Sequence, residues 1–274
     1  MRGAHGRAVV TAPATRWLRA RWHVDRGIAA VLAVLVSPLA AVVWAVVRTV
    51  DGAPAVVRLP RVGRDGVEFA MDKFRSMTVQ APSGQAGGAA LTVGADPRVT
   101  PLGRRLRHYR LDELPQLRNV VRGEMALLGP RPETPVYVDL TDPRWQAVVA
   151  ARPGIAGPTQ VVIHDFEAGL AIHDLKRYEA EMVPVKLAID QWYLRHASPR
   201  VDLQVLGALV ERFVLGRPVT RLHRRLAAAL PEVADLFERH EVPPASGRDG
   251  GQQGVPTGTD LGPRRRLREA LPRR

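Results

Sequence analysis

The chain has 274 residues, of which 46% are hydrophobic, and it carries a formal net charge of +13 at pH 7. Because it contains no cysteine, disulfide bonds, thiolate metal sites and a cysteine nucleophile are excluded. The positive charge indicates an anionic partner, which could be nucleic acid, nucleotide phosphates or an acidic membrane surface.

The N-terminal part combines a basic segment with a long apolar run. Residues 1–26 are basic, and we expect them to be irregular. In the next segment, residues 27–48, the only charged residue is the last, Arg48, and the segment is long enough to span a bilayer. Pro38 lies near the middle of this run, and an interior proline removes a helical hydrogen bond and kinks the helix. Ser37 could satisfy the backbone group that the kink frees.

Arginines flank the apolar run on both sides, so the positive-inside rule gives no preferred translocated side. Two arrangements therefore stay open. One is a bent, re-entrant helix that dips into one leaflet and returns, which keeps both flanks on one face of the membrane. The other is an ordinary transmembrane anchor with a proline kink.

The segment after the apolar run is predicted to be extended and then to form a loop. Residues 67–79 are typical of a strand, and they hold Lys73 and Arg75 on either side of an aromatic residue. Such a basic pair most often lies on a solvated face. Residues 80–95 are rich in glycine, alanine and serine, which predicts a flexible loop that we interpret as a linker rather than a lid.

Two adjacent carboxylates, Asp112 and Glu113, follow a basic run at residues 104–110 that suits an amphipathic helix facing anionic headgroups. Pro115 fits a helix only in its first turn, so a short helix should start near residues 112–114 with the acid pair at its N-terminus. A carboxylate pair can hold Mg²⁺ and present a nucleophile, and nearby arginines can hold phosphate oxygens. The plainer alternative is an N-cap Asp and a first-turn Glu on a surface helix.

The second half of the chain has helical periodicity and ends in a polar tail. The expected helices lie at residues 134–151, 174–197, 201–213 and 222–240, the last with Pro231 as its N-terminal or kink residue. From residue 241 onward the composition predicts disorder. The chain lacks a dinucleotide-binding glycine loop, a phosphate loop, a zinc cluster and a Gly-x-Ser-x-Gly elbow, which excludes those enzyme classes.

Several short segments, none decisive alone, occur together between roughly residues 25 and 210. They are Ser37-Pro38, Lys73-Phe74-Arg75-Ser76-Met77, Asp96-Pro97-Arg98 with Thr100 and Gly103, Leu111 to Leu117 with Asn119 and Gly123, Leu128 to Pro132, Pro153-Gly154-Ile155 with Gly157, and Asp190 to Tyr193 with Ser198, Asp202 and Leu203. In their order and spacing these segments resemble the bacterial sugar transferase family. Its members are monotopic phosphoglycosyl transferases that begin exopolysaccharide and glycan assembly on a polyprenyl carrier.

The resemblance implies a mixed α/β, mainly helical fold on the cytoplasmic face of the bacterial inner membrane. Its expected parts are a basic segment (1–26), a re-entrant membrane helix with a Ser37-Pro38 kink (27–48), a catalytic domain with amphipathic interfacial helices (49–215), a helical extension (216–240) and a disordered tail (241–274). The lack of a further span before residue 27 suggests the minimal catalytic form.

The resemblance also implies a reaction. A sugar-1-phosphate would pass from a UDP-sugar to undecaprenyl phosphate or a similar polyprenyl phosphate, with release of UMP and a covalent phosphosugar intermediate on Asp112. Glu113 would be the partner of Asp112, and both would be Mg²⁺ ligands. Lys73, Arg107 and Arg131 are the candidate phosphate contacts. Anionic membrane lipids are a further expected partner.

One segment departs from the family pattern, and two other functions stay open. Residues 158–164 lack the aromatic residue and the later arginine of the family, so His164 or nothing replaces that arginine. A catalytically idle scaffold of the same fold is possible, although the intact acid pair weighs against it. A membrane-tethered nucleic-acid-binding protein is the other alternative, but no helix-turn-helix, RRM or zinc module is evident, so we expect no nucleic acid.

Overall fold

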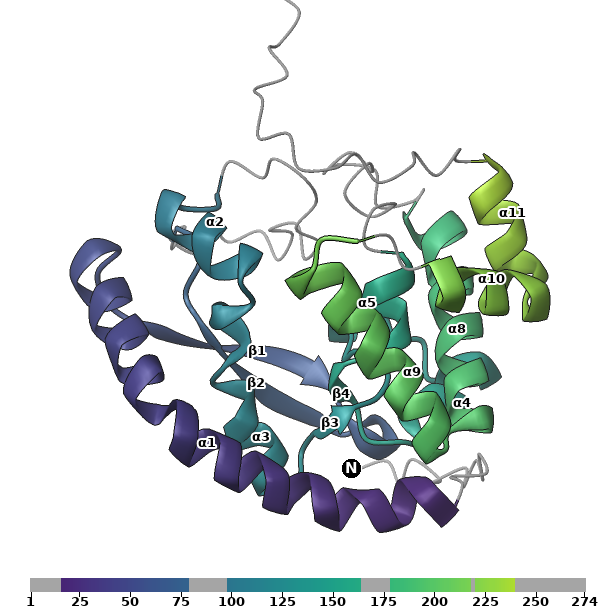
Figure 1. Cartoon of the computed structure of the whole chain (residues 1–274), viewed down its shortest axis with the longest axis horizontal. Helices are drawn as coiled ribbons and strands as arrows, with labels where there is room; N and C mark the ends of the chain where they lie inside the picture. The colour runs from purple at the N-terminus through teal and green to yellow at the C-terminus, as the bar shows by residue number, and fades with distance from the viewer. Residues whose placement is uncertain (1–15, 79–97, 164–177, 218–219, 240–274) are drawn as a thin grey trace, which may run out of the picture. The chain divides into compact units, whose positions relative to one another are not determined.

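A computed structural model describes residues 16–78, 98–163, 178–217 and 220–239. The predictions for the loop at 80–95, for His164 and for the tail from residue 241 lie outside the described residues. All described residues lie within one compact unit. This unit is mainly helical and contains two small sheets, as Figure 1 shows.

The long N-terminal helix is followed by a hairpin and then by short helices and strands. In chain order the helices and strands are α1 (Arg16–Val50), β1 (Val56–Val62), β2 (Glu68–Phe74), α2 (Pro101–His108), α3 (Gln116–Arg122), β3 (Ala126–Leu128), α4 (Pro143–Val149), β4 (Gly154–Ala156), α5 (Pro158–Val162), α8 (Val183–His196), α9 (Pro199–Leu209), α10 (Thr220–Ala229) and α11 (Pro231–Arg239). Strands β1 and β2 pair antiparallel, and β3 and β4 pair parallel. A parallel pair needs a crossover, which here contains α4.

Helix α1 is longer than the sequence predicts. It already begins at Arg16, so the expectation of an irregular segment is wrong for residues 16–26. Pro38 lies inside the helix and cannot donate to the carbonyl oxygen of Val34. The hydroxyl of Ser37 donates to that same oxygen at 2.7 Å, as expected for a proline-interrupted helix.

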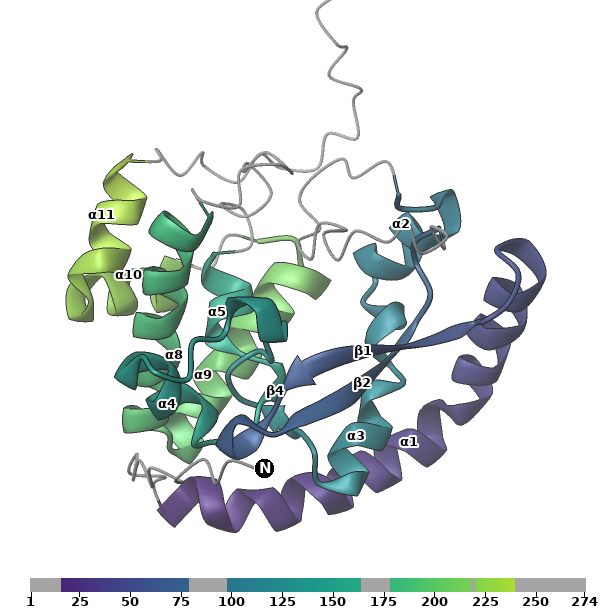
Figure 2. The same ribbon diagram turned by 180° about the vertical axis from the view of Figure 1, so that it is seen from behind.

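The middle of α1 presents apolar side chains to its surroundings. Among the described residues, α1 is the one helix long and apolar enough to cross a membrane, and 11% of its most apolar stretch is buried. A core helix of a soluble protein would be mostly buried, so this low value favours a lipid-facing helix. Figures 1 and 2 show α1 bowed along its length beside α3 and the first hairpin. The re-entrant arrangement stays a prediction.

The first half of α1 is joined to the rest of the unit through one buried arginine. Arg21, which is 6% exposed, donates to the hydroxyl of Tyr193 at 2.7 Å, to the carboxylate of Asp202 and to the carbonyl of Leu128. It also forms an ion pair with Asp25 at 3.3 Å. These contacts connect α1 with β3, α8 and α9, and they explain why the helix extends beyond its apolar run.

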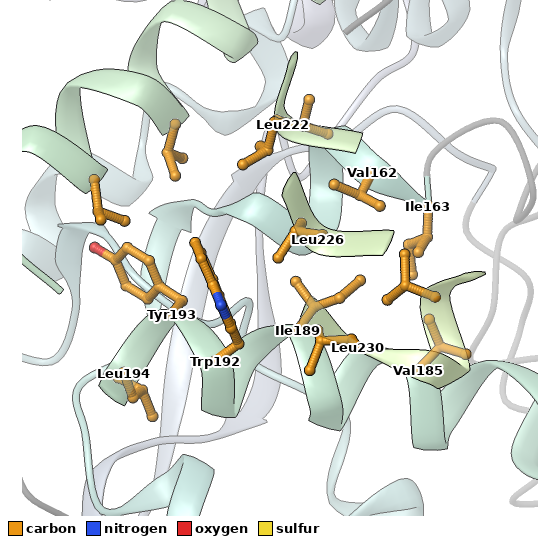
Figure 3. Packing of buried hydrophobic residues seen from close by; sticks show 14 of the residues in the cluster. Val162, Ile163, Val185, Ile189, Trp192, Tyr193, Leu194, Leu222, Leu226 and Leu230 are labelled. Atoms are coloured by element: carbon orange, nitrogen blue, oxygen red, sulfur yellow. The ribbon is translucent and has the colours of Figure 1, made fainter. Parts of the chain in front are cut away.

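The largest apolar core lies among the C-terminal helices. Figure 3 shows residues of α8 packed against residues of α10, with the end of α5 beside them; the labelled ones are Val162, Ile163, Val185, Ile189, Trp192, Tyr193, Leu194, Leu222, Leu226 and Leu230. The described part of the helix expected at residues 222–240, residues 222–239, lies in two helices rather than one. Pro231 begins α11, a position where its missing N–H costs no helical hydrogen bond.

Prolines also decide where other helices begin. The expectation of a continuous helix over residues 134–151 is wrong, because only α4 is α-helical there and Pro135–Tyr137 forms a short 3-10 turn. Asp142 caps α4 by accepting the N–H of Arg144 at 2.7 Å, and Pro143 takes the first helical position. Inside a longer helix, Pro143 could not donate a backbone hydrogen bond to the residue four positions before it, and its ring would clash with the preceding turn.

Two further helices were placed correctly by periodicity but differ at their ends. The helix expected at residues 174–197 is α8, which a π-helical turn at Tyr178–Met182 precedes. The helix expected at residues 201–213 is α9, which continues as a π-helical turn at Val210–Val214.

We predict that Arg21→Leu lowers the free energy of unfolding by about 3 to 5 kcal/mol, because it leaves Asp202 buried without its cation. Chemical denaturation of the detergent-solubilised protein, followed by circular dichroism, measures this change. Arg19→Leu is the matched control, since Arg19 lies on the exposed side of the same helix. Equal unfolding midpoints for both variants would contradict the role given to Arg21.

Asp190 gives a second stability prediction. Burial raises the pKa of this carboxyl to about 7, against the effect of a hydrogen bond from Thr159. Because the folded state then holds a proton that the unfolded chain releases near pH 3.8, stability should fall as pH rises from about 4 to about 7. We expect Asp190→Asn to flatten that slope in thermal unfolding scans, and the exposed Asp65→Asn to leave it unchanged.

Candidate active site

The acid pair lies in a 3-10 turn, Leu111–Glu113, directly ahead of α3. Helical backbone therefore begins close to the predicted position, but the α-helix itself starts only at Gln116, after Pro115. Arg110 precedes the turn with φ 56°, a left-handed conformation that is uncommon for a residue with a Cβ. The two carboxylates that follow it are buried, with Asp112 1% and Glu113 7% exposed.

Asp112 is almost completely buried and faces a lysine from the first hairpin. Asp112 is 1% exposed, and its Oδ2 lies 2.8 Å from Nζ of Lys73 on β2. Among the residues that the structure describes, Oδ1 has no hydrogen-bond partner. Burial lowers the pKa of Lys73, while the charges of Asp112 and Glu113 act in the opposite direction. Oδ1 is thus a buried carboxylate oxygen that neither a hydrogen bond nor an ion pair among the described residues compensates.

Glu113 is held by two arginines. Its Oε1 accepts hydrogen bonds from Arg131 at 2.9 Å and from Arg110 at 3.3 Å. Burial would raise the pKa of Glu113, but the charges of Arg131, Arg110 and Lys73 outweigh it and bring the pKa to about 2. Glu113 is therefore ionised at neutral pH and cannot serve there as a general acid.

The position of Arg131 depends on a close approach of two glycine-containing segments. A Cβ on Gly154 would lie 2.2 Å from the backbone nitrogen of Gly129, and one on Gly157 would lie 2.2 Å from the carbonyl oxygen of Gly129. These contacts are too short for any side chain, so both positions need glycine. The N–H of Gly154 donates to the carbonyl of Pro130 at 2.8 Å, which holds the segment that carries Arg131.

A second buried ion pair lies next to Arg131 along the chain. Lys186 of α8 donates to the carboxylate of Glu133, which also faces Arg61. Burial would raise the pKa of Glu133, but Lys186 above all lowers it below its ordinary value. The backbone carbonyl of Glu133 accepts the N–H of Val62 at 2.9 Å, so this pair joins the end of β1 to the Arg131 segment.

The structure separates the predicted arginines. Arg131 reaches the acid pair, whereas Nε of Arg107 donates to the hydroxyl of Ser76 at 2.9 Å. The phosphate-binding role of Arg107 stays a prediction. Arg118 and Arg122, which flank the acid pair in the sequence, instead lie 3.9 Å and 3.6 Å from the carboxylate of Asp72.

The sequence places Arg110 among the arginines around the acid pair, but it does not single out Arg110, Glu133 or Lys186 as site residues. Arg110 had a local signal, because it precedes Glu113 by three residues, a spacing that brings side chains together on a helical turn. Glu133 and Lys186 had none, since 53 positions separate them in the sequence.

The segment that departs from the family pattern forms α5 and is packed into the core. Val161, Val162 and Ile163 are each at most 2% exposed, and the hydroxyl of Thr159 donates to Asp190 of α8. The described residues of this segment therefore serve packing here.

Comparison with known proteins identifies the family. A profile described as bacterial sugar transferase matches residues 16–216, most of the described chain. The chain belongs to the bacterial sugar transferase family. The segments quoted above from the sequence thus occur in a true family member.

Three relatives illustrate this family. A UDP-N-acetylgalactosamine-undecaprenyl-phosphate N-acetylgalactosaminephosphotransferase of Aeromonas hydrophila is 33% identical over 69% of this chain and 42% of its own length. A UDP-glucose:undecaprenyl-phosphate glucose-1-phosphate transferase of Caulobacter vibrioides is 38% identical over 48% of this chain and 50% of its own. An undecaprenyl-phosphate galactose phosphotransferase of Salmonella typhimurium is 39% identical over 47% of this chain and 29% of its own length. The chain thus spans half or less of each relative's length.

The pairing of Lys73 with Asp112 predicts strong coupling between their substitutions. Lys73→Met leaves a buried carboxylate without its cation and should cost about 3 to 5 kcal/mol of unfolding free energy. Adding Asp112→Asn removes that uncompensated charge and should restore most of the loss. A double-mutant cycle from denaturation curves measures this coupling, and strictly additive costs would show that the two side chains do not act as a pair.

Proposed function

We propose that this protein transfers a sugar-1-phosphate from a UDP-sugar to undecaprenyl phosphate, or a similar polyprenyl phosphate, in the first membrane step of exopolysaccharide or glycoconjugate assembly. The names of its relatives, undecaprenyl-phosphate sugar phosphotransferases, support this reaction class. The single observation that carries the proposal is the buried carboxylate of Asp112, whose Oδ2 forms an ion pair with Lys73 at 2.8 Å and whose Oδ1 has neither an ion pair nor a hydrogen bond among the described residues.

The reaction proceeds in two displacements at one phosphorus atom. A carboxylate oxygen of Asp112 bonds to the phosphorus that carries the sugar, the bond from that phosphorus to the bridging oxygen of the diphosphate breaks, and UMP leaves with the electron pair. A phosphate oxygen of the polyprenyl phosphate then attacks the same phosphorus, and the carboxylate of Asp112 leaves. Such a covalent route divides one difficult step into two easier ones.

Phosphoryl transfer needs positioning and charge neutralisation above all. Lys73, Arg110 and Arg131 supply three positive charges around the acid pair, and each is anchored by a carboxylate before substrate arrives. Phosphate oxygens can share these cations, because a guanidinium group offers more N–H donors than one carboxylate oxygen accepts. Glu113 stays ionised and keeps Arg131 and Arg110 directed toward the site.

The acid pair fits Mg²⁺ in the manner of other phosphoryl-transfer sites. Among the residues that the structure describes, no group of three or more His, Cys, Asp or Glu side chains could cage a metal ion. Mg²⁺ commonly uses one or two carboxylates together with substrate phosphates, and Asp112 and Glu113 would provide those carboxylates. When bound, the ion would screen the negative charge of the diphosphate.

The placement on a membrane follows from α1. We infer that α1 lies in the cytoplasmic face of the bacterial inner membrane as a re-entrant helix, with both basic flanks on the cytoplasmic side. Its exposed apolar side chains and the hydrogen bond from Ser37 to Val34 support this inference. A water-soluble UDP-sugar and a lipid acceptor can then both reach the acid pair.

The proposal predicts that Asp112→Asn lowers UMP release by at least about 1,000-fold, because the nucleophile is lost. The assay contains purified protein, Mg²⁺, undecaprenyl phosphate and a panel of UDP-sugars. The exposed carboxylate variant Asp65→Asn is the control, and circular dichroism verifies that both variants are folded. Folded, membrane-bound wild type that releases no UMP from any donor would contradict the proposal and favour an idle scaffold.

The covalent route has its own readout. Without the lipid acceptor, the wild type should release up to one equivalent of UMP and keep the radiolabelled sugar phosphate on the protein. The Asp112→Asn variant should retain no label. Lipid-dependent transfer without any label on the wild type would favour direct displacement instead.

A further inference from the structure

Three arginines converge on a carboxylate that the proposed reaction does not use. Asp72, 2% exposed, neighbours Lys73 on β2, and successive strand side chains point to opposite faces, so it faces away from the acid pair. Its Oδ1 lies 3.5 Å from Nε of Arg58, and its Oδ2 lies 3.9 Å from Arg118 and 3.6 Å from Arg122.

The cluster has more positive charge and more N–H donors than Asp72 can use. Within the part of the chain that the structure describes, Oδ2 of Asp72 has no hydrogen-bond partner, so none of these ion pairs is a close hydrogen bond to it. The side chains of Arg58, Arg118 and Arg122 are 68%, 60% and 43% exposed. Three guanidinium groups around one carboxylate leave a local charge of about +2, with donors suited to phosphate oxygens.

Arg58, Asp72 and Arg118 of this cluster line an open groove together with apolar residues. The groove has a volume of about 740 Å³, and its lining residues are Trp44, Pro54, Val56, Val57, Arg58, Asp72 and Arg118. Trp44 is 50% exposed and belongs to the last turns of α1. Tryptophan is typical of the level where a membrane meets water. A charged side next to an apolar side matches a lipid headgroup above its acyl chains.

We propose that this groove binds the phosphate headgroup of an anionic membrane phospholipid. Arg58 and Arg118 take the phosphate oxygens, and Trp44 lies against the glycerol and the first acyl carbons. Asp72 holds the guanidinium groups together when no lipid is present. Trp44 belongs to the helix that we place in the membrane, which favours a lipid over a water-soluble nucleotide. The proposal rests on the membrane placement of α1 but not on the sugar transfer reaction.

The test titrates the full chain, purified in a neutral detergent, with dioctanoyl phosphatidylglycerol and follows binding by native mass spectrometry. Dioctanoyl phosphatidylcholine and inorganic phosphate are titrated in parallel. We expect saturable binding of phosphatidylglycerol that weakens at least about fivefold in Arg58→Gln and in Arg118→Gln. Arg200→Gln, at an exposed arginine on α9, is the matched control and should bind as the wild type does.

Three results would overturn the proposal. Equal binding of phosphatidylcholine would indicate apolar contact alone. Inorganic phosphate binding with the same affinity and the same dependence on Arg58 and Arg118 would indicate a free-phosphate site. Unchanged phosphatidylglycerol binding in the folded arginine variants would place the lipid elsewhere. Asp112→Asn should bind phosphatidylglycerol normally, so loss of the transfer reaction and loss of this site are distinguishable.

Discussion

The buried guanidinium of Arg21 is the interaction on which the arrangement of the other elements depends. A buried charge is costly unless it is paired and hydrogen-bonded, and Arg21 has one partner in its own helix and three in other segments of the chain. One of them is the carbonyl of Leu128, directly before the Gly129-Pro130-Arg131 segment. The same contact that joins α1 to α8 and α9 therefore also fixes the strand that leads to Arg131. Helix α1 and the segment that carries Arg131 are thus joined through one side chain.

In the acid pair, too, each buried charge has a partner of opposite charge. Lys73 balances Asp112, and Arg131 with Arg110 balances Glu113, so no charge in the site is left alone. Such pairs are weak evidence for stability, because desolvation offsets much of their attraction. Their value here is positional. They hold cations around the acid pair, as the proposed reaction requires. Strand β2 presents Lys73 to this site, while Asp72 faces the arginine groove on its other side.

Local features of the chain were predictable because local rules govern them. The hydroxyl of Ser37 binds the carbonyl that Pro38 leaves unpaired, since the two groups lie on one helical turn. The helical backbone at the acid pair, strand β2 and the helices α8 and α9 also follow from periodicity and proline chemistry. The helix that periodicity predicts over residues 134–151 is interrupted, because Pro143 fits only the first turn of a helix.

The sequence by itself determined the family and the two carboxylates of the candidate site, because the motif that contains them is contiguous and chemically specific. Only the tertiary structure decided which arginine serves which carboxylate. Arg118 lies six residues after Asp112 yet pairs with Asp72, whereas Arg131 reaches back to Glu113 across 18 positions. An ion pair depends on where the backbone brings two side chains, and the chain folds so that glycine contacts, strand alternation and Arg21 set those positions. Sequence spacing does not encode these long-range distances.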